Sequence, residues 1–107
     1  MKAQDLTNMA AQDLFDRAME DLNHDVSGMW WSRPNRRLRT CSAEVYESPN
    51  FYILRSYNTF IGAIEKSTGF GSDMLRHEYG YTATSAQHLS KFFSDYGDRQ
   101  KVYRWYN

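Results

Sequence analysis

The sequence predicts a single α+β domain, with two helices packed on one face of a small antiparallel sheet of about four to five strands. Apolar residues recur at helical spacing over residues 1–28, and an alternating pattern follows across 37–81. A second helical stripe covers 84–97, and a short aromatic-rich strand covers 101–106. A chain of 107 residues suits one domain, so we expect no domain boundary.

The first predicted helix is amphipathic. Its apolar stripe consists of Leu6, Ala10, Ala11, Leu14, Phe15, Ala18, Met19, Leu22 and Val26. Asp5 or Thr7 can cap its start, and Ser27-Gly28 can end it. Its acids lie mostly off the stripe, which fits a solvated helix face; the alternative is an acidic docking surface. The candidate contacts of such a surface are Asp13, Asp16 and Glu20.

The middle of the chain reads as strands joined by turns. Residues 29–36 form a connector, because Pro34 cannot occupy a helix interior or a central strand. Strands are predicted over 38–46, 51–57 and 60–66, followed by a flexible turn over 68–72 and a weaker extended stretch over 74–81. The strand that begins Phe51-Tyr52-Ile53-Leu54 is apolar on both faces, so either both helices cover it or one face is buried in a partner.

The second predicted helix has clearer end signals. Thr84 is followed three residues later by Gln87, as in a capping box, and Gly97 can end the helix. In the terminal strand, alternation exposes either Tyr103 and Trp105 or Arg104 and Tyr106. The order of elements is therefore helix, several antiparallel strands, helix and strand, without strand–helix–strand alternation.

Composition narrows the class of protein. Thirteen basic and thirteen acidic residues cancel, so no overall field attracts nucleic acid or membranes. Cys41 is the one cysteine, which allows no intrachain disulfide. The N-terminus lacks an apolar signal core, and the apolar runs are too short to cross a bilayer. These features predict a cytoplasmic protein without a membrane partner.

Residues suited to metal binding or catalysis are scattered. His24, His77, His88 and Cys41 lack zinc-ligand spacing, so we expect no metal and no other cofactor. Ser85 is not part of a G-x-S-x-G elbow and is better explained as a residue of the helix cap. The Gly69-Phe70-Gly71 run lacks the third glycine or lysine of a phosphate-binding loop. The sequence therefore predicts a protein that is not an enzyme.

One segment concentrates arginine beside tryptophan. Within seven positions lie Arg33, Arg36, Arg37 and Arg39, close after Trp30 and Trp31. Arginine and tryptophan are enriched at protein-interface hot spots, and guanidinium groups bind phosphates and carboxylates in a bidentate manner. Two interpretations stand. Either the tryptophans cap the core while the arginines pair with the acidic helix, or the segment contacts a partner.

Two motifs carry a resemblance to a family. The first motif is Ser56-Tyr57-Asn58-Thr59 between two apolar strands, and the second is Tyr81-Thr82-Ala83-Thr84-Ser85-Ala86-Gln87-His88 at a helix start. Over roughly residues 51–93, the chain resembles a small domain of unknown function found in bacteriophage, plasmid and other mobile-element proteins. It departs from that pattern at Gln87, where an arginine often precedes the histidine. The resemblance implies a gene of mobile origin, and it implies no biochemical role.

The combined features predict a protein that binds another macromolecule. We expect a phage or mobile-element protein that binds and occludes a host nucleic-acid-handling or defence complex, in the manner of an anti-CRISPR inhibitor. The alternative is a DNA- or RNA-binding accessory protein that uses Arg33–Arg39 and the nearby aromatic residues. Neutral net charge disfavours that alternative, since phosphate affinity depends on many cations.

Overall fold

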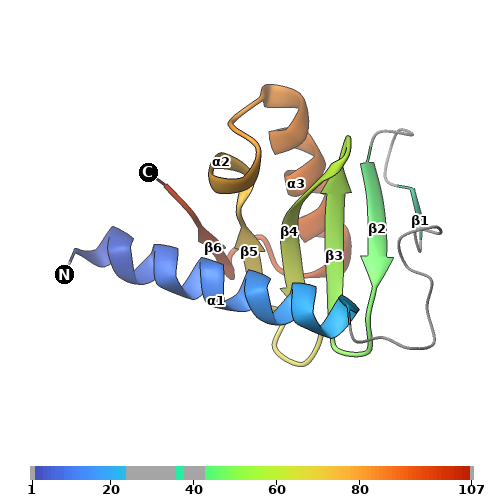
Figure 1. The fold of residues 1–107 in the computed structure, drawn as a ribbon, viewed down its shortest axis with the longest axis horizontal. Helices are drawn as coiled ribbons and strands as arrows, with labels where there is room; N and C mark the ends of the chain where they lie inside the picture. The colour runs from blue at the N-terminus through green and yellow to red at the C-terminus, as the bar shows by residue number, and fades with distance from the viewer. Residues whose placement is uncertain (1, 24–35, 38–42, 107) are drawn as a thin grey trace.

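The structure is a computed structural model that describes residues 2–23, 36–37 and 43–106 (Figure 1). Its elements are α1 (Ala3–Asn23), β1 (Arg36–Arg37), β2 (Ala43–Glu47), β3 (Phe51–Ser56), β4 (Thr59–Glu65), β5 (Gly71–Asp73), α2 (Leu75–Glu78), α3 (Ala83–Tyr96) and β6 (Val102–Arg104). The prediction of an α+β fold is confirmed. The predicted helical residues 24–28, most of the connector 29–36, and residues 38–42 of the first predicted strand lie outside the described residues.

The strands form one six-stranded sheet in the order of the sequence. Neighbouring strands from β1 to β5 are antiparallel, whereas β5 and β6 are parallel. The prediction of a purely antiparallel sheet is therefore wrong at this edge. Parallel neighbours need a long connection that returns the chain to its starting end, and α2 and α3 supply it (Figure 1).

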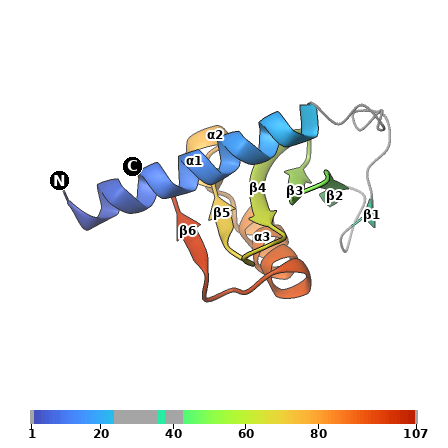
Figure 2. The same ribbon diagram turned by 90° about the horizontal axis from the view of Figure 1, so that it is seen from below.

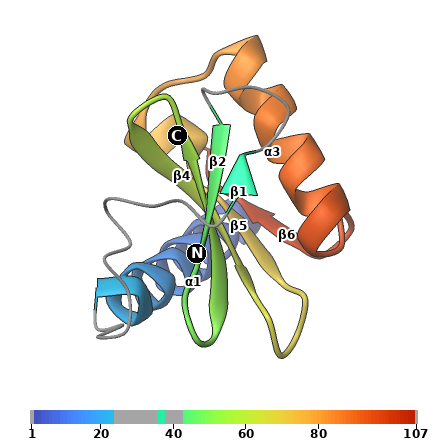
Figure 3. The same ribbon diagram turned by 90° about the vertical axis from the view of Figure 1, so that its right-hand side faces the viewer.

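The helices cover opposite faces of the sheet, so the prediction that both pack on one face is wrong. Figure 2 and Figure 3 show α1 on one side of the sheet and α3 on the other. Strand β3 explains this arrangement, because its side chains alternate between two apolar cores. Phe51 and Ile53 pack in the core beneath α1, and Leu54 packs in the core beneath α3. Of the two interpretations of this strand, the structure shows the one in which both helices cover it.

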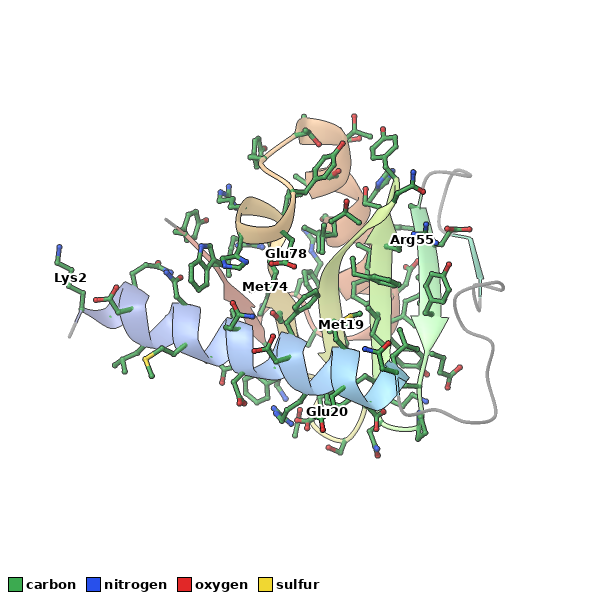
Figure 4. All side chains as sticks on the ribbon, in the orientation of Figure 1. Lys2, Met19, Glu20, Arg55, Met74 and Glu78 are labelled. Carbon is green, nitrogen blue, oxygen red and sulfur yellow. The ribbon has the colours of Figure 1, made fainter. Side chains whose placement is uncertain are left out.

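The apolar stripe of α1 forms its buried face. The buried residues are Ala11, Leu14, Phe15, Ala18 and Leu22. Met19 points towards the sheet and Glu20 points away from it (Figure 4). Near the end of the helix, the Asp21 carboxylate accepts hydrogen bonds from the Ser48 hydroxyl at 2.5 Å and from the Asn50 backbone N–H at 3.0 Å. These bonds tie α1 to the turn between β2 and β3.

Helix α3 lies close to its face of the sheet because two strand positions carry no side chain. A Cβ added at Gly62 would lie 2.7 Å from a methyl carbon of Leu89, and one at Gly71 would lie 2.7 Å from the ring of Phe93. Strand β4 also contains a bulge, since Leu54 pairs with Gly62 while Arg55 pairs with Phe60. The intervening residue, Ile61, is thereby buried in the core beneath α3.

Two element boundaries differ from the prediction. The N-cap of α3 is Thr82, whose hydroxyl accepts the Ser85 backbone N–H at 3.1 Å; Thr84 lies inside the first turn. Strand β5 occupies residues predicted as a flexible turn, and the predicted extended stretch over 74–81 contains α2 instead. Residues 75–78 do not pair in the sheet, because the chain leaves it after Asp73 to begin the crossover.

Candidate functional site

A groove lies between α1 and the segment that follows β6. Its volume is about 700 Å³, and its lining is Asp5, Asn8, Met9, Gln12, Asp13, Asp16, Trp105 and Tyr106. Helical spacing places Asp5, Met9, Gln12 and Asp16 along one side of α1. The parallel pairing of β6 with β5 brings the C-terminal aromatic residues beside that side of the helix.

Hydrogen bonds fix the two walls of the groove to each other. The Asn8 side-chain oxygen accepts the backbone N–H of Tyr106 at 3.0 Å, and its amide nitrogen donates to the backbone carbonyl of Tyr106 at 2.6 Å. The Gln4 side-chain nitrogen donates to the carbonyl of Arg104 at 3.2 Å. The groove is therefore held by contacts between residues close to both ends of the chain.

The groove combines an apolar surface with a negative rim. Met9 has 57% of its surface exposed, and the edge of the groove includes the exposed Tyr106. Trp105 is half-buried and packs against the core beneath α1. Exposed apolar side chains gathered in one hollow are more informative about binding than single ones, which are common on protein surfaces.

The acids of the groove are only partly neutralised. Asp13 pairs with Arg17 at 3.1 Å, but Arg17 also pairs with Glu65 at 2.8 Å. The hydrogen bond from Arg17 holds the pKa of Glu65 below its ordinary value. Asp16 accepts a hydrogen bond from the neutral Gln12 amide at 2.7 Å. Within the described part of the chain, neither Asp5 nor Asp16 has a cation at ion-pair distance, so the rim is negative.

The structure brings together two of the residues that the sequence predicts at a docking surface. Asp13 and Asp16 line the groove, whereas Glu20 is exposed on the same helix outside it. The predicted contacts Trp30, Trp31, Arg33 and Arg39 lie outside the described residues. Arg36 and Arg37 form β1, and only their backbone is described. Strand β1 is at the sheet edge opposite β6, away from the groove (Figure 1).

The two motifs of the proposed family resemblance meet on the α3 side of the sheet. The Ser56 hydroxyl oxygen lies 3.0 Å from the Ser85 hydroxyl oxygen and 2.9 Å from Nδ1 of His88. All three side chains are buried. A serine nucleophile must reach a substrate, so this closed arrangement fits a polar contact that locks α3 onto β3. Ser85 thus bonds within the core, although the sequence suggests a cap residue.

Beside this cluster, Tyr57 has an uncommon backbone conformation. Its φ of 57° lies in the left-handed region, which bulky residues rarely adopt. The ring stacks on Tyr79 at a centroid distance of 6.5 Å and lies 6.0 Å from the ring of His88. The β3–β4 turn is thereby tied to the end of α2 and the start of α3. We assign these contacts to folding, since they hold three elements together.

The part of the chain that the structure describes contains neither a metal-binding cluster nor a membrane-spanning helix. No group of three His, Cys, Asp or Glu side chains there is arranged to hold a metal ion. None of the described helices is long and apolar enough to cross a membrane. Comparisons with protein-family models, curated proteins and solved structures found no match.

Sequence reasoning missed the aromatic wall of the groove. Of the two alternations predicted for the last strand, the structure shows the one that exposes Arg104 and Tyr106 and turns Tyr103 and Trp105 towards the core beneath α1. The α1 side of the groove could have been recognised in the sequence, because Met9 is a large apolar residue that lies off the apolar stripe and is not part of the core. Nothing in the sequence pattern indicated that the two chain segments adjoin.

Proposed function

We propose that this protein is a non-enzymatic binding protein whose groove between α1 and Trp105-Tyr106 takes a basic and apolar surface of a protein partner. The observation that carries the proposal is the pairing of an exposed apolar side chain, Met9, with two carboxylates, Asp5 and Asp16, that have no cation at ion-pair distance among the described residues. Apolar burial supplies affinity at such a surface, and opposite charge favours the correct partner and its rate of association. A role of this kind requires no catalytic site.

The resemblance to mobile-element domains suggests the class of partner. Proteins that handle nucleic acids carry basic surfaces, and an acidic helix can occupy such a surface in place of the phosphate backbone. We therefore propose a phage or mobile-element protein that occludes a host nucleic-acid-handling or defence complex in the bacterial cytoplasm. The acids that line the groove, Asp5, Asp13 and Asp16, supply the contact. Asp16 is at its centre because it has no cationic partner among the described residues.

Photo-crosslinking in a bacterial host lysate tests the proposal. Benzoylphenylalanine replaces Met9 in the groove or, as a control, the exposed Gln87 on α3 at the opposite face. We expect a discrete crosslinked protein from position 9 and none from position 87. Asp16→Lys should abolish the product, and Glu20→Lys should preserve it, although both variants change the charge of the same exposed helix face equally. Equal loss with both variants would refute a role for the groove.

A salt titration separates this proposal from direct nucleic-acid binding. The Arg33–Arg39 segment is the basis of that alternative, and affinity for phosphates falls steeply as salt concentration rises. We expect no measurable binding of closed circular duplex DNA at roughly 0.15 M salt. Micromolar or tighter binding that weakens with salt and is lost in the Arg36→Glu/Arg37→Glu variant would favour the alternative instead.

A further inference from the structure

A second hollow lies between α2, α3 and the C-terminal strand, and among the described residues Tyr106 is the one lining residue that it has in common with the α1 groove. Its volume is about 900 Å³, within the range of small-molecule sites. Three arginines line it, namely Arg76 on α2, Arg99 after α3 and Arg104 on β6. The rings of Tyr81 and Tyr106 also line it. Arg76, Tyr81 and Arg99 belong to the crossover between the two parallel strands, whereas Arg104 ends β6 and Tyr106 follows it.

Arg76 is held between the two tyrosine rings. Its guanidinium carbon lies 4.8 Å from the ring centroid of Tyr81 and 4.5 Å from that of Tyr106. Contact with ring faces orients the guanidinium plane while leaving its N–H groups, which lie in that plane, available to a ligand. Among the described residues, no acid lies at ion-pair distance from Arg76. The structure thus holds a positive charge in place without neutralising it.

The other charges of the hollow leave a net positive site. Arg104 pairs with the buried Asp73 at 2.8 Å, so these two charges cancel. Arg99 has no acidic partner at ion-pair distance in the described segments. The Asp98 carboxylate accepts the backbone N–H of Gln100 at 2.9 Å and is the remaining negative charge. Two uncompensated guanidinium groups against one carboxylate favour an anionic ligand.

We propose that this hollow binds a nucleoside phosphate. Arg76 and Arg99 supply charge-assisted hydrogen bonds to phosphate oxygens, for which the planar guanidinium is well matched. The exposed ring of Tyr81 supplies a stacking surface for the base, as aromatic residues do in single-strand binding sites. A phosphate ion alone would leave most of the volume empty. A free nucleotide and the 5′-phosphorylated end of a single strand present the same chemistry, and the experiment distinguishes them.

Calorimetric titration of the full chain at roughly 0.15 M salt tests the proposal. The ligands are adenosine 5′-monophosphate, adenosine, inorganic phosphate and a short single-stranded oligonucleotide with or without a 5′-phosphate. We expect the monophosphate to bind at least ~10-fold more tightly than adenosine or phosphate alone. Tighter binding of the phosphorylated oligonucleotide than of the monophosphate identifies a strand end as the ligand, and equal binding identifies a free nucleotide.

Matched variants assign the binding to this hollow. Arg76→Gln should weaken binding of the monophosphate by ~10-fold or more, and Arg76→Lys by less, because lysine keeps the charge but loses the planar fork. Lys101→Gln removes a charge from an exposed residue outside the hollow and should leave binding unchanged. Tyr81→Leu should weaken binding, whereas Tyr79→Leu, at another exposed tyrosine outside the hollow, should not.

Three results would overturn the assignment. They are a monophosphate that binds no better than inorganic phosphate, an affinity unchanged by Arg76→Gln, or tighter binding of a phosphotyrosine peptide than of the nucleotide. Thermal melting of each variant shows that it is folded. Asp16 lines the α1 groove but not this hollow, so Asp16→Lys should leave nucleotide binding unchanged even if the protein partner is lost.

Discussion

Nδ1 of His88 lies 2.9 Å from the hydroxyl oxygen of Ser56, although the two residues are 32 positions apart in the chain. The same hydroxyl also contacts Ser85, so a strand and a helix share one buried polar cluster. Both motifs of the proposed family resemblance contribute to it. A domain that keeps these motifs would therefore keep the docking of α3 on β3, independently of what its surface binds.

Removing the central hydroxyl of this cluster should destabilise the fold. Ser56→Ala leaves the buried Ser85 and His88 each without one partner, and a buried group that loses its partner costs about 1–3 kcal/mol. Urea denaturation measures the change. Ser90→Ala, at an exposed serine of the same helix, should change the free energy of unfolding by less than about 0.5 kcal/mol. Equal effects of the two substitutions would contradict a structural role for the cluster.

The packing of α1 on the sheet predicts that truncating two different leucines of that helix will change the free energy of unfolding by very different amounts. Leu14 is 2% exposed, whereas Leu6 is 56% exposed. Leu14→Ala should lower the free energy of unfolding by about 2–5 kcal/mol, as buried leucine truncations do. Leu6→Ala should change it by less than about 0.5 kcal/mol. A melting temperature that Leu14→Ala leaves unchanged would mean that α1 does not pack on the sheet in solution.

The start of α3 offers a similarly matched test. Thr82→Ala removes the hydroxyl that accepts the Ser85 backbone N–H, and loss of an N-cap costs about 1 kcal/mol. Thr84→Ala should be neutral or slightly stabilising, because Thr84 is exposed inside the first turn and alanine is the better helix former. Chemical denaturation of both variants distinguishes the two positions. A larger loss at Thr84 would move the cap to that residue.

Protonation of the Asp21 carboxylate should lower the stability of the protein in acid. Burial acts to raise the pKa of this carboxyl, but hydrogen bonds from Ser48 and Asn50 outweigh it and lower the pKa below its ordinary value of 3.8. A carboxyl with a lowered folded-state pKa stabilises the fold fully above the ordinary value, and this contribution is lost as pH falls through the lower folded-state value. Urea midpoints measured from roughly pH 7 to about pH 2.5 should therefore decline.

Substitution isolates the contribution of Asp21 to that decline. Asp21→Asn cannot titrate, so its midpoint should be lower at neutral pH and should fall less steeply in acid. The pKa of Glu65 is also lowered by its hydrogen bond from Arg17, so both proteins are best compared in a Glu65→Gln background. An acid dependence that Asp21→Asn leaves unchanged in that background would exclude the proposed cause.

Local sequence signals were sufficient for the elements whose burial follows a simple period. The stripe of α1 and the alternation of β3 depend on neighbouring residues in the chain, so their buried faces could be predicted. The first motif alone could not indicate that Ser56 meets His88, because hydrogen bonds between distant residues leave no local period. The predicted capping box at Thr84 was wrong because Thr82 offers the same hydroxyl chemistry two residues earlier.

The least predictable part of the fold was the sheet edge formed by β5 and β6, beside which both candidate sites lie. Gly71 and Ser72 read as turn residues, yet they form a buried strand, since a glycine there admits the ring of Phe93. The parallel pairing of that strand with Val102–Arg104 depends on where the crossover returns the chain. This pairing places Trp105 in the same groove as Met9. Because neither α1 nor the C-terminal segment reveals the pairing by itself, the groove could not be predicted from the sequence.

The bonds between Asn8 and Tyr106 have a consequence for self-association. β6 is the outer strand on its side, and the free backbone of an outer strand can recruit a strand from another molecule. Just past β6, the Asn8 amide pairs with both the N–H and the carbonyl of Tyr106, as a residue of an adjoining strand would. A single side chain of the helix thus occupies both backbone hydrogen-bonding groups of Tyr106, so an incoming strand could not pair with the chain at that residue.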